Sequence, residues 1–246
     1  SGGHILRFAP WEGVFLCIAR VGRILTVSAG LMRETLPQRR RVSGGMAASM
    51  KSFTALFRQP YFMGHCIMQC FSFAAFFAYI SGSSFVFQNV YGVSAQAFSL
   101  IFGINGVGLM INGAVTGRLT GRIADWKLLR FSLCLAAVGS VALLAAFSTG
   151  MPLPVIMVIL FLTVSTLSMM STSSFSMAMQ DQGRNAGSAS ALIGFFSMIS
   201  GAVMAPVVGI AGDHTAIPMG IVMVIGEIGA LLAFYALIYP RHRKER

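Results

Sequence analysis

Seven long apolar stretches dominate the sequence, and each is close to the length that a helix needs to cross a lipid bilayer. They run over Trp11–Met32, Tyr61–Phe87, Ala97–Gly117, Phe131–Thr149, Pro154–Met177, Ala189–Gly209 and Pro218–Tyr239. A helix rising about 1.5 Å per residue needs roughly 20 residues to span the hydrocarbon core. We therefore expect an all-α polytopic membrane protein.

Lysine and arginine are concentrated in alternate gaps between these stretches. Residues 33–60 contain six of them, residues 118–130 contain four and residues 240–246 contain four, whereas residues 88–96, 150–153 and 210–217 contain none. Cytoplasmic loops carry the excess of Lys and Arg in membrane proteins. The pattern predicts six spans from Tyr61 onward, with both ends of this bundle and the C-terminus in the cytoplasm.

The composition excludes several other classes of protein. With 56% hydrophobic and 10% charged residues, the net charge of +11 needs no nucleic acid, because the basic residues are divided among loops that anionic lipid attracts. No GxSxG motif, phosphate-binding loop or metal quartet is present. Cys66 and Cys70, beside His65, are interpreted as buried thiols and not as a metal site. We expect no enzyme activity and no cofactor.

The first stretch differs from the other six because it contains Arg20 and Arg23. Each central Arg opposes insertion by roughly 2.5–3.5 kcal/mol, so this segment alone would barely insert. We expect residues 1–32 to form a degenerate transmembrane helix and residues 33–60 a basic cytoplasmic connecting loop. Residues 61–239 are then the six-helix bundle, and residues 240–246 a basic cytoplasmic tail.

The six remaining stretches form two sets of three, Tyr61–Thr149 and Pro154–Tyr239, whose first helices each carry a polar stripe at helical spacing. The stripe in the first set contains His65, Gln69, Ser72, Phe76, Tyr79 and Ser83, and that in the second contains Ser165, Ser168, Thr172 and Ser176. Lipid offers such groups no hydrogen-bonding partner. Both stripes are therefore expected to face protein or a water-filled cavity.

The second helix of each set carries small residues at every fourth position, which favours close helix packing. These residues are Gly113, Gly117 and Gly121 in the first set, and Ser197, Gly201, Ala205 and Gly209 in the second. Two three-helix units that start on opposite sides of the membrane form a 3+3 inverted repeat. Secondary transporters are built in this way.

Several motifs resemble one transporter family. They are Tyr79–Gln88, Tyr91-Gly92, Gln96, Phe98 and Phe102–Asn105, with Glu34–Pro37 and Gly187–Gly194 as further matches. The block from Tyr79 to Asn105 is similar to helices seven and eight of the Bcr/CflA drug-resistance transporters, which are drug:proton antiporters of the major facilitator superfamily. The resemblance implies the six-helix C-terminal bundle of a major facilitator fold, preceded by a degenerate sixth helix.

The same resemblance implies a function: the C-terminal half of a proton-coupled multidrug efflux transporter of the bicyclomycin/chloramphenicol-resistance type, working by alternating access in a bacterial cytoplasmic membrane. Its partners would be a small-molecule drug or amphipathic substrate, protons, the lipid bilayer and a missing N-terminal half. In that family the acidic residue expected to couple protons lies in the first helix, which has no counterpart here.

Candidate site residues fall into three groups. The substrate-cavity candidates are Gln69, Ser72, Phe76, Tyr79, Asn105, Asn112, Ser165, Ser168 and Thr172. The proton-coupling candidates are Glu227 and His65, because ionisable groups inside a membrane are functional by default. The gate and packing candidates are Arg118, Arg122 and Asp125, which loosely resemble the basic, glycine-containing loop of the superfamily, and Gly201, Pro206 and Gly209, which resemble its Gly/Pro antiporter motif.

Alternatives remain open for these residues and for the whole chain. Glu227 could instead have a structural role, and His65 is predicted near enough to the cytoplasmic end to reach the interface. Asn105 and Asn112 are equally suited to forming hydrogen bonds between helices. A chain beginning at Ser1, with arginines in its first span, also fits a truncated, non-transporting membrane remnant or interaction partner. A third hypothesis is a major facilitator carrier for a metabolite.

Overall fold

A computed structural model describes residues 12–31, 45–210 and 215–243, and the regular elements in these ranges are helices. Of the predicted segments, residues 1–11, 32–44 and 244–246 lie outside the described residues. The elements are α2 (Glu12–Leu31), α3 (Gly45–Phe57), α4 (Pro60–Phe85), η2 (Val86–Val90), α5 (Ala95–Leu119), α6 (Asp125–Ser148), α7 (Leu153–Met179), η3 (Gly183–Asn185), α8 (Ala186–Ile210), α9 (Ile217–Ala233), η4 (Phe234–Ile238) and α10 (Tyr239–Arg243). The π-helical turns η2 and η4 continue α4 and α9.

Six helices in the described part of the chain are long and apolar enough to cross a membrane: Pro60–Val90, Ala95–Leu119, Asp125–Ser148, Leu153–Met179, Ala186–Gly209 and Ile217–His242. They contain the apolar stretches predicted from Tyr61 onward, except that the third span ends at Ser148, one residue before the predicted Thr149. The predicted all-α membrane bundle is therefore confirmed. Helix α2, which contains Arg20 and Arg23, is not one of the six.

The helices begin where the local sequence favours a helix start. Prolines occupy the first turns of α4, α7 and α9, where their missing N–H removes no helical hydrogen bond. The Ser94 hydroxyl caps α5 by accepting from the backbone N–H of Ala97 at 3.3 Å. Asp125 places a carboxylate in the first turn of α6, where the helix dipole stabilises negative charge.

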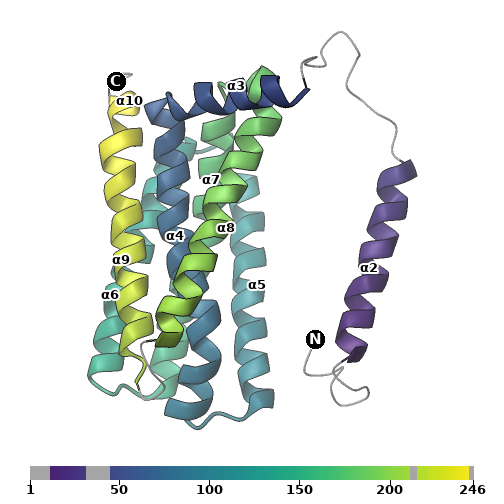
Figure 1. The fold of residues 1–246 in the computed structure, drawn as a ribbon. Coiled ribbons are helices and arrows are strands. Elements are labelled where there is room, and N and C mark those ends of the chain that lie inside the picture. The colour runs from purple at the N-terminus through teal and green to yellow at the C-terminus, as the bar shows by residue number, and fades with distance from the viewer. Residues whose placement is uncertain (1–11, 32–44, 211–214, 244–246) are drawn as a thin grey trace.

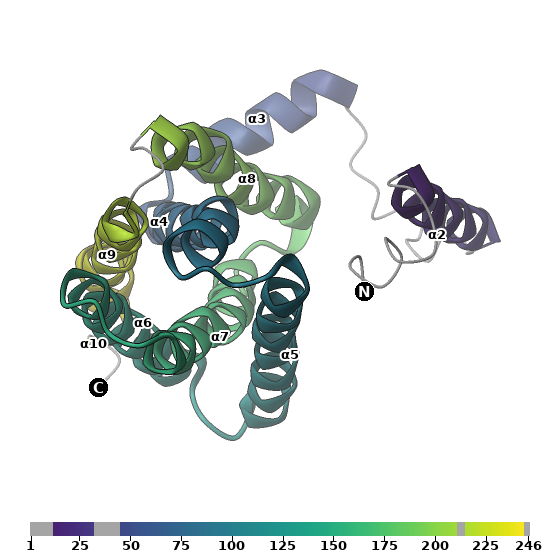
Figure 2. The same cartoon turned by 90° about the horizontal axis from the view of Figure 1, so that it is seen from below.

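The packing of the six spans repeats between the two sets of three. Helix α4 packs on α8 and α9, helix α7 packs on α5 and α6, and α6 packs on α9. Exchanging the first set (α4, α5, α6) with the second (α7, α8, α9) reproduces the same contacts. Figures 1 and 2 show this arrangement around α4 and α7. It is the packing expected of a 3+3 inverted repeat.

Two helices lie outside this six-helix arrangement. Helix α2 stands apart from the bundle, whereas α3 lies across the end of the bundle that also carries α10 (Figure 1). Leu56 of α3 is fully buried against Phe62 of α4 and Leu192 of α8. The Ser52 hydroxyl donates to Asn185 Oδ1 at 3.3 Å. A docked helix thus occupies part of the segment that the sequence predicts to be a connecting loop.

Close helix contacts occur at only some of the glycines in the small-residue seams, and also at a glycine outside them. Gly139 of α6 lies directly against the Thr163 side chain of α7, and Gly201 of α8 lies against the Phe77 ring of α4. A Cβ placed at Gly117 or Gly209 would meet no atom within 4 Å in the described part of the chain. Gly201 is therefore a packing residue within this bundle, whereas Gly117 and Gly209 are on open surfaces.

Replacing Gly139 with valine should separate α6 from α7, because its Cβ would overlap the Thr163 hydroxyl. We expect the free energy of unfolding to fall by about 1–3 kcal/mol, the usual effect of overpacking. Thermal or detergent-induced unfolding of the purified protein measures this. Gly103→Val in α5 is the matched control, because a Cβ there meets nothing within 4 Å; equal destabilisation by both variants would contradict the described packing.

Candidate functional site

The polar stripe of α4 lies inside the bundle, and near the end that carries α3 and α10 it is hydrogen-bonded to two other helices. His65 and Gln69 are buried, and both contact the Ser174 hydroxyl of α7: His65 Nδ1 at 3.0 Å and Gln69 Nε2 at 3.2 Å. The Ser197 hydroxyl of α8 donates to Gln69 Oε1 at 3.3 Å. His65 is 0% exposed, so its side chain is enclosed by other parts of the bundle. Its Nε2 has no hydrogen-bond partner among the described residues.

Half-way along the bundle, the stripe contacts the carboxylate predicted in the last span. The Ser72 hydroxyl of α4 donates to Glu227 Oε2 of α9 at 3.2 Å. Both side chains are buried, and Glu227 is 7% exposed. Because the lipid around the bundle offers no hydrogen bonds, this contact is the one that holds the carboxylate in the described structure.

Closer to the other end, the stripe contacts α5. Asn105 Nδ2 donates to the Tyr79 hydroxyl at 3.1 Å, and both residues are buried. The Tyr79 ring stacks on Phe102 with centroids 5.6 Å apart and ring planes 11° apart. Asn105 therefore joins two helices at the place where the sequence predicts a cavity wall.

A continuous series of aromatic rings, which we call the aromatic series, crosses α4 from α8 to α5. Neighbouring ring centroids are 5.6–6.4 Å apart. Its members are Phe73, Phe76, Phe77, Tyr79, Phe87, Phe98 and Phe102. At one end Phe77 lies against Gly201 of α8, and at the other end Phe87 is 1% exposed; Phe102, between Tyr79 and Phe98, is 40% exposed. The predicted cavity residue Phe76 is half-buried within the series.

The remaining cavity candidates have different environments. Ser165 is buried beside Gly108 of α5, and its hydroxyl has no hydrogen-bond partner among the described residues. Ser168 and Asn112 are half-buried, and Thr172 is exposed. Asn112 accepts from the Thr116 hydroxyl one turn along α5. Thr172 and Asn112 thus lie at the surface of the bundle, unlike the α4 stripe.

The predicted charged gate has a different set of contacts from the one implied by the resemblance. Asp125 Oδ2 accepts from the Ser176 hydroxyl of α7 at 2.7 Å, whereas neither Arg118 nor Arg122 forms an ion pair with it in the described structure. The carboxylate is close to α7 because α6 begins at Asp125 and packs along α7. Pro206 lies within α8 and is exposed. The roles of these residues in a gate stay predictions.

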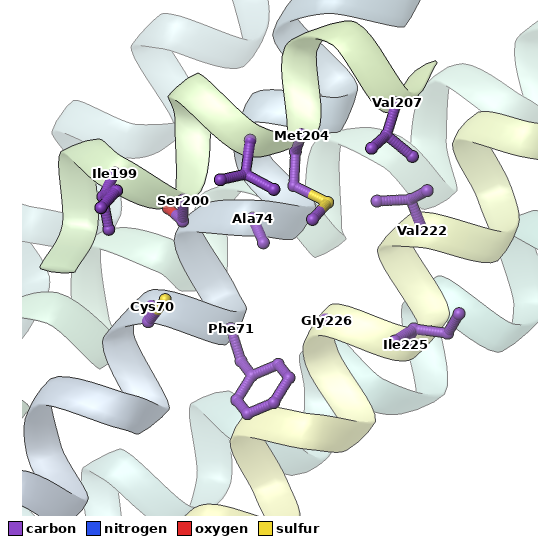
Figure 3. Close-up of a pocket in the computed structure, with 11 residues that line it drawn as sticks. Cys70, Phe71, Ala74, Ile199, Ser200, Met204, Val207, Val222, Ile225 and Gly226 are labelled. Carbon is purple, nitrogen blue, oxygen red and sulfur yellow. The ribbon is translucent and has the colours of Figure 1, made fainter. Parts of the chain in front are cut away.

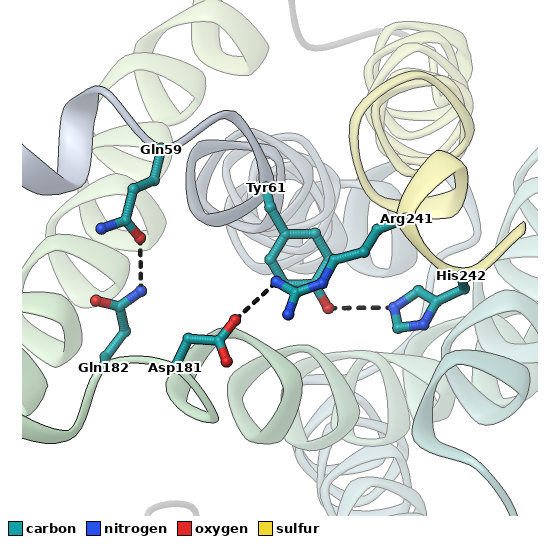
Figure 4. A network of polar contacts seen from close by, with 6 residues as sticks. All are labelled: Gln59, Tyr61, Asp181, Gln182, Arg241 and His242. Atoms are coloured by element: carbon teal, nitrogen blue, oxygen red, sulfur yellow. Dashed lines mark hydrogen bonds and ion pairs between the residues drawn. The ribbon is translucent and has the colours of Figure 1, made fainter. Parts of the chain in front are cut away.

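A second polar network, which the sequence did not single out, ties the C-terminal turn to the same end of the bundle (Figure 4). Arg241 forms an ion pair with Asp181 at 2.7 Å and lies 4.5 Å above the Tyr61 ring. The Tyr61 hydroxyl is 3.2 Å from His242 Nε2. Gln182 donates to Gln59 at 2.7 Å beside them. The network joins α10 to the start of α4 and the end of α7.

The sequence analysis did not single out several residues of these contacts as site residues, although Ser197 belongs to a small-residue seam and Phe102 to the Tyr79–Asn105 block. Ser174 and Ser197 are single hydroxyls in helices rich in small residues, and only the fold reveals that they meet Gln69. Phe73, Phe77 and Phe102 belong to a chain rich in phenylalanine, where composition does not separate a site from lipid-facing surface. No cluster of three or more metal-ligating side chains occurs in residues 12–31, 45–210 and 215–243.

Asp181→Asn should lower the free energy of unfolding by about 1 kcal/mol or less, because exposed ion pairs contribute little and these two side chains are 46% and 53% exposed. Tyr61→Ala should destabilise more, since it removes both the ring under Arg241 and the contact with His242. Detergent-induced unfolding compares the two variants. A larger effect for Asp181→Asn would show that the ion pair, and not Tyr61, holds the C-terminal turn.

Comparison with known proteins places this arrangement in a family. A sequence model described as the Major Facilitator Superfamily matches residues 1–206. An uncharacterized MFS-type transporter of Bacillus subtilis, YdgK, is 36% identical over 244 residues, which are 98% of this chain and 60% of that protein. A bicyclomycin resistance protein homolog of Haemophilus influenzae is 26% identical over 248 residues, covering 100% of this chain and 62% of that protein. The chain therefore spans about three fifths of the length of these curated relatives, and it belongs to the Major Facilitator Superfamily.

Proposed function

We propose that the chain is the C-terminal half of a proton-coupled multidrug exporter that works by alternating access. The observation that carries the proposal is the aromatic series across α4, with the buried Tyr79–Asn105 hydrogen bond beside it. A wall of rings with few hydrogen-bonding groups suits flat amphipathic molecules, because rings offer large apolar contact areas and attract cations to their faces. The curated relative named as a bicyclomycin resistance homolog is in keeping with a drug substrate.

The other half of the transporter would pack against α5 and α8. These are the two least buried of the six spans, and α5 exposes Leu100, Met110 and Ile111. Gly117 and Gly209 have open space above them, which leaves room for close approach of another helix backbone. The aromatic series runs between these two helices and would face the substrate path between the halves.

Two buried ionisable groups are proposed as proton-coupling residues. His65 and Glu227 each hydrogen-bond to a hydroxyl on another helix, so a change of charge at either would act on a contact between helices. Groups of this kind inside membranes mark proton pathways in many transporters. The alternation of Lys and Arg between loops supports an orientation with α3, α10 and the C-terminus on the cytoplasmic side of a bacterial inner membrane.

Phe102→Ala should weaken substrate binding, because it removes the ring stacked on Tyr79. Aromatic pairs contribute about 0.5–1.5 kcal/mol, so the substrate concentration for half-maximal transport should rise by up to about tenfold. Drug transport into inverted vesicles that contain the full-length protein measures this. Phe131→Ala is the matched control, since Phe131 of α6 is 61% exposed and outside the aromatic series. Equal effects of the two variants would argue against this binding wall.

Glu227→Gln should abolish transport driven by a pH gradient while preserving exchange of labelled for unlabelled substrate, because exchange needs no net proton movement. Glutamine keeps an oxygen that can accept from Ser72, so the helix contact is retained. His65→Asn is tested in the same way. Gradient-driven transport by both variants at the rate of the unmodified protein would place proton coupling elsewhere.

A further inference from the structure

One side of the bundle carries an apolar slot of about 410 Å³ between α8 and α9. Both helices pack extensively on α4 but hardly on each other, so α4 forms the floor of the slot and the two helices form its walls. Figure 3 shows Phe71, Met204, Val222 and Ile225 around the open space. The volume is in the range of small-molecule sites in proteins, roughly 300–1,000 Å³.

The chemistry of the walls restricts what the slot can bind. Apart from the Cys70 thiol and the Ser200 hydroxyl, its lining side chains are hydrocarbon, with the thioether of Met204. The Ser200 hydroxyl donates to the Ser197 carbonyl at 2.6 Å and is therefore already bonded. A ligand would find no charge and no free amide or hydroxyl donor there. An occupant must be purely apolar over the length that enters.

The floor separates the slot from the buried carboxylate. Gly226 of α9 rests on the backbone of α4, where a Cβ would lie 2.7 Å from the Phe71 carbonyl oxygen. Neither Ser72 nor Glu227 lines the slot, although each follows a lining residue in sequence. This contact blocks a direct route from the slot to the Ser72–Glu227 pair. The slot is thus distinct from the proposed drug and proton sites.

The position of the slot within the membrane spans indicates that lipid can reach it. Its residues lie within three membrane spans, and its rim residues Val203 and Ile225 are 52% and 60% exposed at that depth. The α9 side of the rim lies outside the interface of α5 and α8 proposed for the other half, so lipid hydrocarbon would reach the slot from that side. An unfilled space of this size would leave its walls without dispersion contacts that a hydrocarbon chain can supply.

We propose that the slot between α8 and α9 binds one acyl chain of a membrane phospholipid, held between the two helices as a non-annular lipid. The chain enters sideways from the bilayer and packs on Ala74 and Val222. The acyl chain fills the space between α8 and α9, which hardly contact each other. The lipid headgroup stays outside the slot, since nothing in the lining binds it.

Photo-crosslinking tests this assignment with a phospholipid as the probe. The protein is placed in vesicles of phosphatidylethanolamine and phosphatidylglycerol that contain a trace of phosphatidylcholine with a diazirine in mid-chain, and adducts are mapped by mass spectrometry. Ala74 and Ala137 are each 8% exposed, but only Ala74 lines the slot. We expect adducts at Ala74 and none at Ala137. Equal adducts at both, or none at Ala74, would overturn the proposal.

A substitution that fills the slot with a large side chain provides a second test. Ser200→Phe should abolish the adduct at Ala74 and leave the adducts of freely exchanging lipid at Val138, which is 69% exposed on α6. Val138→Phe is the matched control and should leave the Ala74 adduct unchanged. An Ala74 adduct that persists in correctly folded Ser200→Phe would contradict binding in the slot. Cross-links from the slot to a second polypeptide in place of lipid would also overturn it.

Discussion

The absence of hydrogen-bonding partners in lipid is the constraint on which this bundle depends. Helix α4 carries several buried polar side chains that lipid cannot hydrogen-bond, and four of them bond to other helices. Tyr79 is satisfied by α5, His65 by α7, Gln69 by both α7 and α8, and Ser72 by α9. Of the other five spans, only α6 lacks such a side-chain hydrogen bond to α4 in the described structure, and α6 instead packs on α7 and α9.

The two halves of the repeat share their packing but not their chemistry. Helix α7 occupies the position of α4 in the second set, yet its threonines mostly donate to their own backbone: Thr163 to the Ile159 carbonyl and Thr166 to the Thr163 carbonyl. A hydroxyl that bonds to the backbone of its own helix does not favour one neighbouring helix over another. The polar and aromatic groups that join several helices are concentrated on α4. The candidate site therefore lies mainly on one of the two repeats, although the two repeats pack in the same way.

The sequence was sufficient to predict the spans and the α4 stripe, because hydropathy over roughly 20 residues and a 3–4 spacing are both local signals. It was insufficient to identify Ser174 and Ser197, whose significance lies in meeting Gln69 from distant helices. The small-residue seams lie on α5 and α8, whereas Gly139 packs from α6, so Gly139 was missed. Helix α3 was missed because it is short and lies among basic residues that suggest a loop. The slot exists because α8 and α9 both pack on α4 but hardly on each other. No local sequence pattern predicts such a gap between two helices.

A double-mutant cycle on Ser72 and Glu227 tests most directly whether hydrogen bonds from α4 hold the bundle together. Ser72→Ala, Glu227→Met and the double variant are compared by the free energy of unfolding in bilayers or mixed micelles. The account predicts a coupling energy of about 0.6 kcal/mol and at most about 1.7 kcal/mol, the average and the maximum found for such contacts in a membrane protein. Strictly additive effects would contradict it, since they would mean that the two side chains are close without stabilising each other.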